Sequence, residues 1–397
     1  MNREDFEILK SGIVYFDNGA TTLKPKILGK TISDYYNNYS ANAHRGDYDI
    51  SLKVDNLIEK SREQVRKLIN AKDLSEIVFT SGATDSLNKI IFGYFKNYLK
   101  KGDEVILSKS EHASNVLPWF ELVDDLGIKI RYVELDELLK INLDNLKKVI
   151  NSKTKVISLA HITNVIGDVR DIKKIISLAH KNNILVVIDG AQSIPHQKID
   201  VQKLDIDFLA FSAHKMCGPT GVGILYGKRQ LLTNIKPIIF GGGMNANFTN
   251  DGARIYSELP YLLEAGTPNI AGIIGFGKII EYLNNIGFDN IHKYEMKLRK
   301  YAIEKLKKIP QLKIYNEQSE SGIIIFNMEN IFAQDLAIYL NKYHICVRAG
   351  SHCAKMLKDD LGIKNTCRIS FYFYNTFEEI DYLVKTLSNK NIMNEII

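Results

Sequence analysis

A lysine follows a predicted buried strand in the segment FLAFSAHKMCGPTGVG, residues 208–223. The apolar run ends at Ser212, Lys215 comes three residues later, and a glycine-rich turn follows. Burial lowers the pKa of an amine, and the neutral amine is the form that condenses with a carbonyl to make a Schiff base. The segment therefore favours a reactive lysine, although a lysine on a surface loop fits the same letters.

A carboxylate ends a second strand of the same kind. Residues 184–189 read ILVVID, a continuous apolar run typical of a strand buried in a parallel sheet, and the run ends at Asp189. Open α/β sheets bind ligands in the crevice at the carboxyl ends of their strands. An amine that holds an aldehyde and a carboxylate that holds a protonated pyridine nitrogen are the pair that pyridoxal phosphate requires. We therefore expect Lys215 and Asp189 to bind this cofactor; a loop or capping role for Asp189 is the alternative.

A phosphate site is expected where a third strand leads into a helix. The residues TSGAT (80–84) end the apolar run EIVFT and begin a helical pattern. Backbone N–H groups and the helix dipole at such a position favour a dianionic phosphate, and Thr84 can add its hydroxyl. A plain helix N-cap is the other interpretation of these residues.

The order of the elements predicts how these groups are positioned. From Glu76 onward, apolar strands alternate with helical patterns, which predicts an α/β fold with a mainly parallel mixed sheet sandwiched by helices. Near residue 285 a long charged helix (287–308) begins, and strands with fewer crossovers follow. We predict a large domain of residues 15–284 and a smaller α+β domain in residues 285–397.

The composition excludes several classes of protein. The net charge of +6 is spread over scattered basic and acidic residues, so nucleic-acid binding is not indicated. The N-terminus is charged, and no apolar run approaches the about 18 residues of a membrane span. The four cysteines lack the spacing of a zinc site or a disulfide framework, so we expect a reduced, cytoplasmic protein without a metal. The segment GIIGFGK (272–278) has the spacing of a P-loop. Ile279 stands where a P-loop requires Ser or Thr, and the segment lies in a helical pattern, so we do not expect it to bind a nucleotide.

Ten segments, in order along the chain, resemble motifs of the class V aminotransferase superfamily of pyridoxal-phosphate enzymes. The resemblance is closest to the group II (SufS-type) cysteine desulfurases, and selenocysteine lyases are near relatives. The segments are YFDNGATT (15–22), NAHRG (42–46), FTSGATDSLN (79–88), SEHASNVLPW (110–119), HITNVIG (161–167), VVIDGAQS (186–193), FSAHKMCGPTGVG (211–223), EAGTPNI (264–270), RAGSHCA (348–354) and RISFYFYNT (368–376). No single segment is specific, whereas ten in order are.

The resemblance implies aminotransferase fold type I, in which the arm 1–14 joins the small domain, and an obligate homodimer. It implies that His112 stacks on the pyridine ring and shuttles a proton, and that Gln192 hydrogen-bonds the ring oxygen. It also implies a set of phosphate ligands: Ala83, Thr84, Ser212, His214 and Thr267. Of these, Thr267 would come from the neighbouring subunit.

The amino-acid substrate needs a group that holds its carboxylate. Arg368 opens the apolar strand RISFYF, and a guanidinium binds carboxylate bidentately; a structural ion pair is the alternative. The resemblance places Asn164 and His44 near the substrate and Arg348 near the loop that carries the nucleophile.

Cys353 is the candidate nucleophile. It lies in a predicted loop beside a histidine and near an arginine, where a thiolate is favoured, although an incidental surface thiol fits the same position. The loop departs from the family pattern: Ser351 replaces the first of two histidines, and Lys355-Met356 stands where Gln-Pro or Met-Pro is common. The departure puts in doubt the tuning of the thiolate and the docking of a partner.

The resemblance implies conversion of L-cysteine to L-alanine, with the sulfur held as a persulfide on Cys353. A SufE- or SufU-like sulfur-acceptor protein would then take the sulfur for iron–sulfur cluster assembly. Two alternatives stay open: a selenocysteine lyase, and a catalytically altered scaffold that binds pyridoxal phosphate in sulfur transfer.

Overall fold

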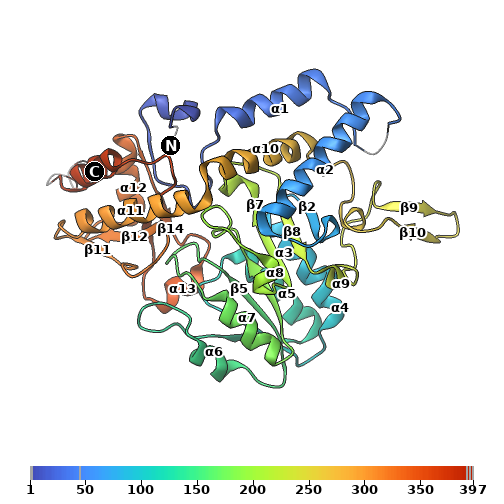
Figure 1. The fold of residues 1–397 in the computed structure, drawn as a ribbon. Coiled ribbons are helices and arrows are strands. Elements are labelled where there is room, and N and C mark those ends of the chain that lie inside the picture. The colour runs from blue at the N-terminus through green and yellow to red at the C-terminus, as the bar shows by residue number, and fades with distance from the viewer. Residues whose placement is uncertain (1–2, 44–45, 390–391, 393–394, 396–397) are drawn as a thin grey trace.

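A computed structural model describes residues 3–43, 46–389, 392 and 395. Its centre is a seven-stranded sheet in the order β2-β8-β7-β6-β5-β3-β4 (Figure 1). The strands are β2 (Ile77–Thr80), β3 (Glu104–Leu107), β4 (Lys129–Tyr132), β5 (Thr154–Ala160), β6 (Leu185–Asp189), β7 (Phe208–Ser212) and β8 (Gly223–Gly227). Pairs among β3 to β7 are parallel, and β8 is antiparallel to both of its neighbours. The predicted mainly parallel mixed sheet is confirmed.

Helices cover both faces of this sheet, which is why its strands are apolar at successive positions. In β6, Val186 and Ile188 pack into one hydrophobic cluster, whereas Val187 between them packs into another. The helices of this part are α1 (Lys26–Asn38), α2 (Asp49–Ile69), α3 (Ala83–Asn88), α4 (Lys96–Tyr98), α5 (Leu117–Leu126), α6 (Leu143–Val149), α7 (Ile172–Lys181), α8 (Val201–Leu204), α9 (Arg229–Leu232) and α10 (Ile270–Ile286).

The segment with P-loop spacing lies inside α10, not after a strand. Its glycines allow close helix packing against α1 and α2. A Cβ added at Gly277 would lie 2.4 Å from Ser61 Oγ, and one at Gly275 would lie 2.7 Å from Leu28 Cδ1. Helix contact therefore explains these glycines.

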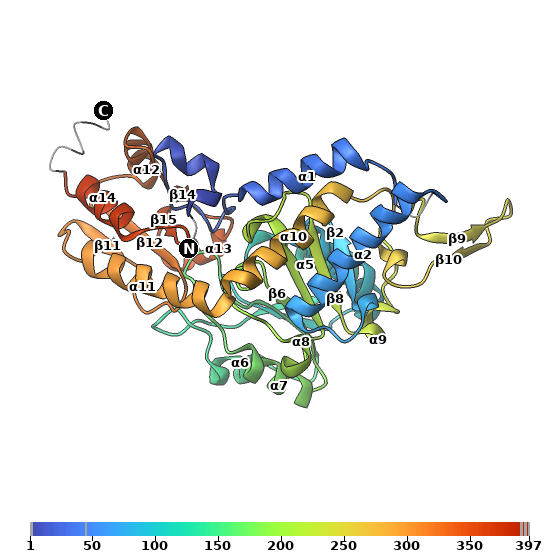
Figure 2. The ribbon, with the colours of Figure 1, turned by 45° about the horizontal axis from the view of Figure 1, so that its top comes forward.

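A second, four-stranded sheet stands at one end of the molecule (Figures 1 and 2). Its order is β11-β12-β15-β14, and all its pairs are antiparallel. The elements of this part are α11 (Phe288–Leu306), β11 (Leu312–Ile314), β12 (Ile323–Met328), α12 (Ala333–Lys342), β13 (Ile345–Cys346), β14 (Arg348–Gly350), α13 (Lys355–Asp360), β15 (Thr366–Ser370) and α14 (Phe377–Leu387).

The N-terminal segment packs on this second sheet. Strand β1 (Val14–Tyr15) pairs in parallel with β13. Phe6 is fully buried, with its ring centroid 4.4 Å from that of Tyr374, and Arg3 is paired with Glu379. At the other end of the molecule, the hairpin of β9 (Asn245–Phe248) and β10 (Arg254–Tyr256) projects from the body (Figures 1 and 2). Of the helices in the described ranges, none is long and apolar enough to cross a bilayer.

Candidate active site

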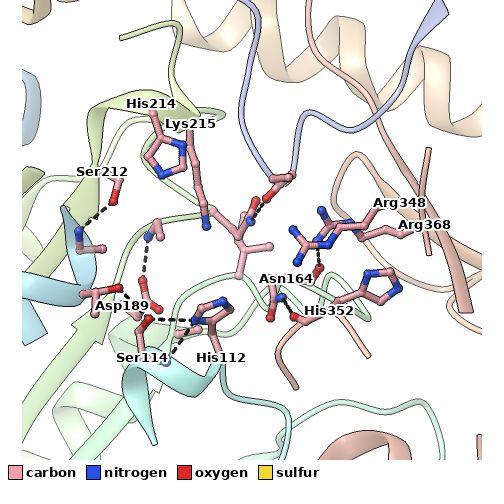
Figure 3. Close-up of a pocket in the computed structure, with 18 residues that line it drawn as sticks. His112, Ser114, Asn164, Asp189, Ser212, His214, Lys215, Arg348, His352 and Arg368 are labelled. Carbon is pink, nitrogen blue, oxygen red and sulfur yellow. Dashed lines mark hydrogen bonds between the residues drawn. The ribbon is translucent and has the colours of Figure 1, made fainter. Parts of the chain in front are cut away.

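A cavity of about 200 Å³ lies where the carboxyl ends of β5, β6 and β7 face β14 and β15. Side chains from both sheets and from the N-terminal segment line it (Figure 3). In this view Ser212 and Asp189 lie toward one end, Arg348 and Arg368 lie at the other, and Lys215 reaches in between them. The carboxyl ends of β5, β6 and β7 lie together because neighbouring parallel strands end at the same edge of a sheet. The polar residues that follow these strands therefore meet in the cavity.

Lys215 and Asp189 are electrostatically coupled within the cavity. Lys215 ends a single 3₁₀ turn, Ala213–Lys215, directly after β7. Burial lowers the pKa of this amine to about 8, although Asp189 acts in the opposite direction. Asp189 ends β6, and its Oδ1 accepts a hydrogen bond from the Ala191 N–H at 2.9 Å. Burial raises the pKa of the Asp189 carboxyl, and Lys215 partly offsets this effect.

His112 is held as a neutral imidazole of one tautomer. Its Nδ1 accepts a hydrogen bond from the Ser114 N–H at 3.1 Å, because the residue caps the turn Ala113–Asn115. Burial lowers its pKa to about 4, and Lys215 and two arginines contribute to the decrease. With the Nδ1 lone pair engaged and the ring neutral, the proton resides on Nε2.

Three of the residues expected to bind phosphate, Ala83, Thr84 and Ser212, lie at the start of α3. Ser212 Oγ accepts a hydrogen bond from the Ala83 N–H at 2.8 Å, and Thr84 Oγ1 lies 2.8 Å from Ser114 Oγ. His214 Nδ1 lies 3.2 Å from Thr21 Oγ1, and burial lowers the His214 pKa to about 4. The turn contacts β8 closely: a Cβ added at Gly223 would lie 2.4 Å from Gly82 Cα.

Arg368 on β15 is almost fully buried, with 1% of its surface exposed. Its Nη1 donates to Asn164 O at 2.8 Å, and its Nη2 donates to Asp17 Oδ1 at 3.0 Å. Burial lowers its pKa, and Asp17 opposes this effect. Arg348 is the register partner of Arg368 on β14, so the two guanidinium groups start from the same face of the sheet.

Cys353 lies beside this arginine pair in the loop between β14 and α13, and its side chain is exposed. Its Sγ lies 3.9 Å from Arg348 Nη2. His352 and Cys353 have φ angles of 54° and 59°, in the left-handed region that costs free energy for residues other than glycine. Two tertiary hydrogen bonds hold this backbone: Asn164 Nδ2 donates to His352 O at 2.6 Å, and the Ala113 N–H donates to Cys353 O at 2.9 Å.

Three buried polar atoms of residues that line this cavity have no hydrogen-bond partner among the described residues. They are Asn164 Oδ1, His352 Nδ1 and Arg368 Nε. An unsatisfied buried polar atom is costly, and such atoms are rare in native proteins. One donor and two acceptors together therefore indicate a site for a polar ligand.

Most of the residues predicted from the sequence line this one cavity: Ala83, Thr84, His112, Asn164, Asp189, Gln192, Ser212, His214, Lys215, Arg348 and Arg368. Gln192 is buried there, and its Nε2 donates to Gly19 O at 2.7 Å. Thr267 is exposed and lines a different cavity, with its Oγ1 3.4 Å from Asn42 Nδ2. His44 lies outside the described residues.

Asp17 and Ser114 are among the site residues that sequence reasoning missed. Asp17 pairs with Arg368, and Ser114 contacts both His112 and Thr84. Their position in the sequence could have indicated them, because both lie in segments that carry the family resemblance, YFDNGATT and SEHASNVLPW.

Comparisons with known proteins show which family the chain belongs to. The model of the family "Aminotransferase class-V" matches residues 14–383. A probable cysteine desulfurase of Halalkalibacterium halodurans is 40% identical over 383 residues, which are 96% of this chain and 94% of the relative. The apo structure of a cysteine desulfurase from Thermococcus onnurineus NA1 superimposes with a TM-score of 0.93 at 36% identity, covering 97% of this chain and 96% of that one. A cysteine desulfurase structure from Escherichia coli, CsdA in its S-sulfonic acid form, also has a TM-score of 0.93, at 35% identity, over 99% of this chain and 97% of that one.

Proposed function

The chain belongs to the class-V aminotransferase family, and we propose that it is a pyridoxal-phosphate-dependent cysteine desulfurase that converts L-cysteine to L-alanine. The proposal is supported by relatives of that name that match nearly the whole chain, and by a cavity that unites a lysine, a strand-end carboxylate and an arginine pair. The predicted membership in this family and fold class is thereby confirmed.

The donor set fits pyridoxal phosphate. Asp189 offers a buried carboxylate for a pyridinium N–H, and Lys215 offers an amine of lowered pKa for the aldehyde. Ala83, Thr84, Ser212 and His214, which line the same cavity, would bind the phosphate, and Gln192 and His112 would contact the ring. When bound, this cofactor supplies an electron sink for negative charge that develops at the substrate Cα.

Arg368 and Asn164 would orient the substrate. The unpaired Arg368 Nε and the Nη2 that now contacts Asp17 are donors for the substrate carboxylate. The unpaired Asn164 Oδ1 is an acceptor. Lys215, whose pKa is about 8, can then move a proton at the substrate Cα near neutral pH, while the neutral His112 presents an Nε2–H to the cavity.

Cys353 would take the sulfur. Its thiolate attacks the substrate sulfur, a new S–S bond forms, and the Cβ–S bond breaks with its electron pair left on the substrate carbon, which is then protonated. The net change is L-cysteine plus the Cys353 thiol to L-alanine plus a Cys353 persulfide. Arg348 Nη2 lies 3.9 Å from this Sγ. The exposed position lets an acceptor protein reach the persulfide.

We further propose a cytoplasmic homodimer that passes sulfur to a SufE- or SufU-like acceptor for iron–sulfur cluster assembly. Thr267 would reach the partner's phosphate site from its exposed position. Exposed apolar side chains also lie in and next to the β9–β10 hairpin: Ile239, Phe240, Phe248 and Ile255. They support a subunit interface at this part of the molecule. Residues 15–284 would form the large domain, and residues 1–14 and 285–397 the small one. His44 would lie near the substrate.

The observation that carries the proposal is the location of Cys353 next to the cavity that contains Lys215, Asp189 and Arg368. The test is incubation of the purified protein with L-cysteine, followed by mass spectrometry of each cysteine, with Cys353→Ala compared with Cys346→Ala. We expect added sulfur on Cys353 and equal amounts of alanine in the wild type and in Cys346→Ala. Cys353→Ala should make neither product, yet borohydride should still fix the cofactor to Lys215.

Each other outcome contradicts a separate part of the proposal. Alanine formation that survives Cys353→Ala would exclude this cysteine as the nucleophile. No borohydride adduct at Lys215 would exclude the cofactor assignment. An adduct without alanine formation would indicate the scaffold, and a strong preference for L-selenocysteine over L-cysteine would indicate the lyase.

A further inference from the structure

Lys358 is a buried cation next to the loop that carries Cys353. It lies in α13, which begins two residues after Cys353, and only 2% of its surface is exposed. In the part of the chain that the structure describes, its ammonium has one hydrogen-bond partner, Thr366 Oγ1 at 2.5 Å, and no carboxylate within ion-pair distance. Lys355, one turn earlier in the same helix, is exposed. A buried ammonium without a carboxylate is costly, so the position calls for a reason beyond packing.

The partner of Lys358 also binds the residue before the nucleophile. Thr366 is fully buried at the start of β15, the strand that carries Arg368. His352 Nε2 lies 3.0 Å from the Thr366 carbonyl oxygen and 3.0 Å from its Oγ1. One threonine therefore connects the Lys358 ammonium with the His352 ring.

These contacts determine the tautomer of His352. A carbonyl oxygen only accepts, so Nε2 carries the proton that points to Thr366. Burial lowers the His352 pKa to about 2, with Arg368 and Lys358 contributing, so the ring is neutral. Nδ1 then carries a lone pair, and it is one of the unpaired atoms of the cavity.

We propose that Lys358 is a positioning residue for sulfur transfer: through Thr366 it fixes the His352 ring and so holds the left-handed His352–Cys353 backbone in which the thiol faces the substrate site. The inference rests on the proposed desulfurase function. Two consecutive left-handed residues without glycine persist only when their surroundings hold them. The backbone bonds from Asn164 and Ala113 hold the carbonyl groups of this turn, and the Lys358–Thr366 pair holds its one buried side chain.

The role predicts that sulfur transfer and substrate binding respond differently. Lys358→Met keeps a long apolar side chain but removes the donor. We expect single-turnover persulfide formation on Cys353 to slow about 10-fold, because a small displacement of a nucleophile has effects of this order or larger. The KM for L-cysteine should stay near the wild-type value, since Arg368 keeps its contacts with Asp17 and Asn164.

A second readout does not depend on desulfurase activity. Alkylation of Cys353 by iodoacetamide, followed by mass spectrometry without L-cysteine, reports how firmly the loop is held. We expect alkylation to be faster in Lys358→Met and in Thr366→Val, which loses the hydroxyl but keeps its shape. Thr366→Ser, which keeps the hydroxyl, and Lys355→Met, the exposed control on the same helix, should both match the wild type.

The outcomes are distinguishable. If Lys358→Met and Thr366→Val lower the unfolding temperature but leave persulfide formation and Cys353 alkylation unchanged, Lys358 is only structural and the proposal is wrong. If Thr366→Ser behaves like Thr366→Val, the hydroxyl is not the link. If even the wild type forms no persulfide, the proposed function fails, and the alkylation rates still decide whether Lys358 holds the loop.

Discussion

Lys215 is expected to react as a neutral amine at a far lower pH than an exposed lysine does. Burial lowers its pKa from 10.5 to about 8. At pH 7, an amine of pKa about 8 is neutral in about one molecule in eleven, whereas an ordinary lysine is neutral in about one in 3,000. The neutral fraction of Lys215 is therefore larger by a factor of about 300. Its reaction rate should rise about tenfold per pH unit up to pH 8 and level off above it.

Competitive acylation of the cofactor-free protein measures this titration directly. A trace of acetic anhydride labels each lysine in proportion to its neutral fraction and its accessibility, and mass spectrometry after digestion reads each site separately. Exposed lysines of the same chain, such as Lys30, are internal references. The titration midpoint does not depend on accessibility, because accessibility scales the whole curve.

Substitution of Asp189 tests the direction in which its charge shifts the pKa of Lys215. The charge of Asp189 raises the pKa of Lys215, so Asp189→Asn should lower it and bring the plateau to a lower pH. Asp205→Asn, at a surface carboxylate paired with Lys228, is the matched control and should leave the curve unchanged. A labelling rate that keeps rising through pH 10, or a plateau that moves to higher pH in Asp189→Asn, would refute the reasoning.

Two further predictions concern the substrate site and the phosphate turn. Arg368→Met should lower kcat/KM for L-cysteine by about one to two orders of magnitude, because a hydrogen bond to a charged group is worth about 1.5–3 kcal/mol. The borohydride adduct at Lys215 should remain in this variant. An unchanged kcat/KM would contradict the role of Arg368 in binding the substrate carboxylate. Gly223→Ala places a Cβ 2.4 Å from Gly82 Cα, so we expect a loss of about 1–3 kcal/mol in urea unfolding and weaker cofactor retention. Gly29→Ala in α1, where a Cβ would meet nothing within 4 Å, is the control and should be neutral or stabilising; equal losses in both variants would contradict the steric argument.

The positions of Lys215 and Asp189 were predictable because of how a parallel sheet is buried. A strand covered on both faces is apolar at every position, so the first polar residue after it marks the carboxyl edge of the sheet. Asp189 and Ser212 end β6 and β7 in this way, and β6 pairs with β7. The cofactor end of the site therefore follows from local patterns and one topological rule.

The partner of Arg368 was not predictable from such patterns. The hydrogen bond between Arg368 and Asp17 spans 351 positions of the chain. It forms because Asp17 pairs with Ser370 of β15 in a parallel bridge, and no local periodicity encodes that pairing. Lys358 is a similar case: a lysine in a short helical pattern is usually expected to face solvent, yet tertiary packing buries it against Thr366. The left-handed turn at Cys353 lacks the glycine that would have marked it.

The charges of the cavity decide which group can carry protons. Among the described residues, the histidines that line it are His112, His214 and His352, and burial together with nearby lysines and arginines lowers their pKa values to about 4, about 4 and about 2, respectively. All three are therefore neutral at physiological pH, where they serve as fixed donors and acceptors rather than as acids. Lys215, with its pKa of about 8, is the lining residue whose proton affinity best matches neutral conditions. The lysines and arginines that add to this effect also favour an anionic ligand in the cavity, so under the proposed function the arginines would bind the substrate carboxylate and Lys215 would move the proton.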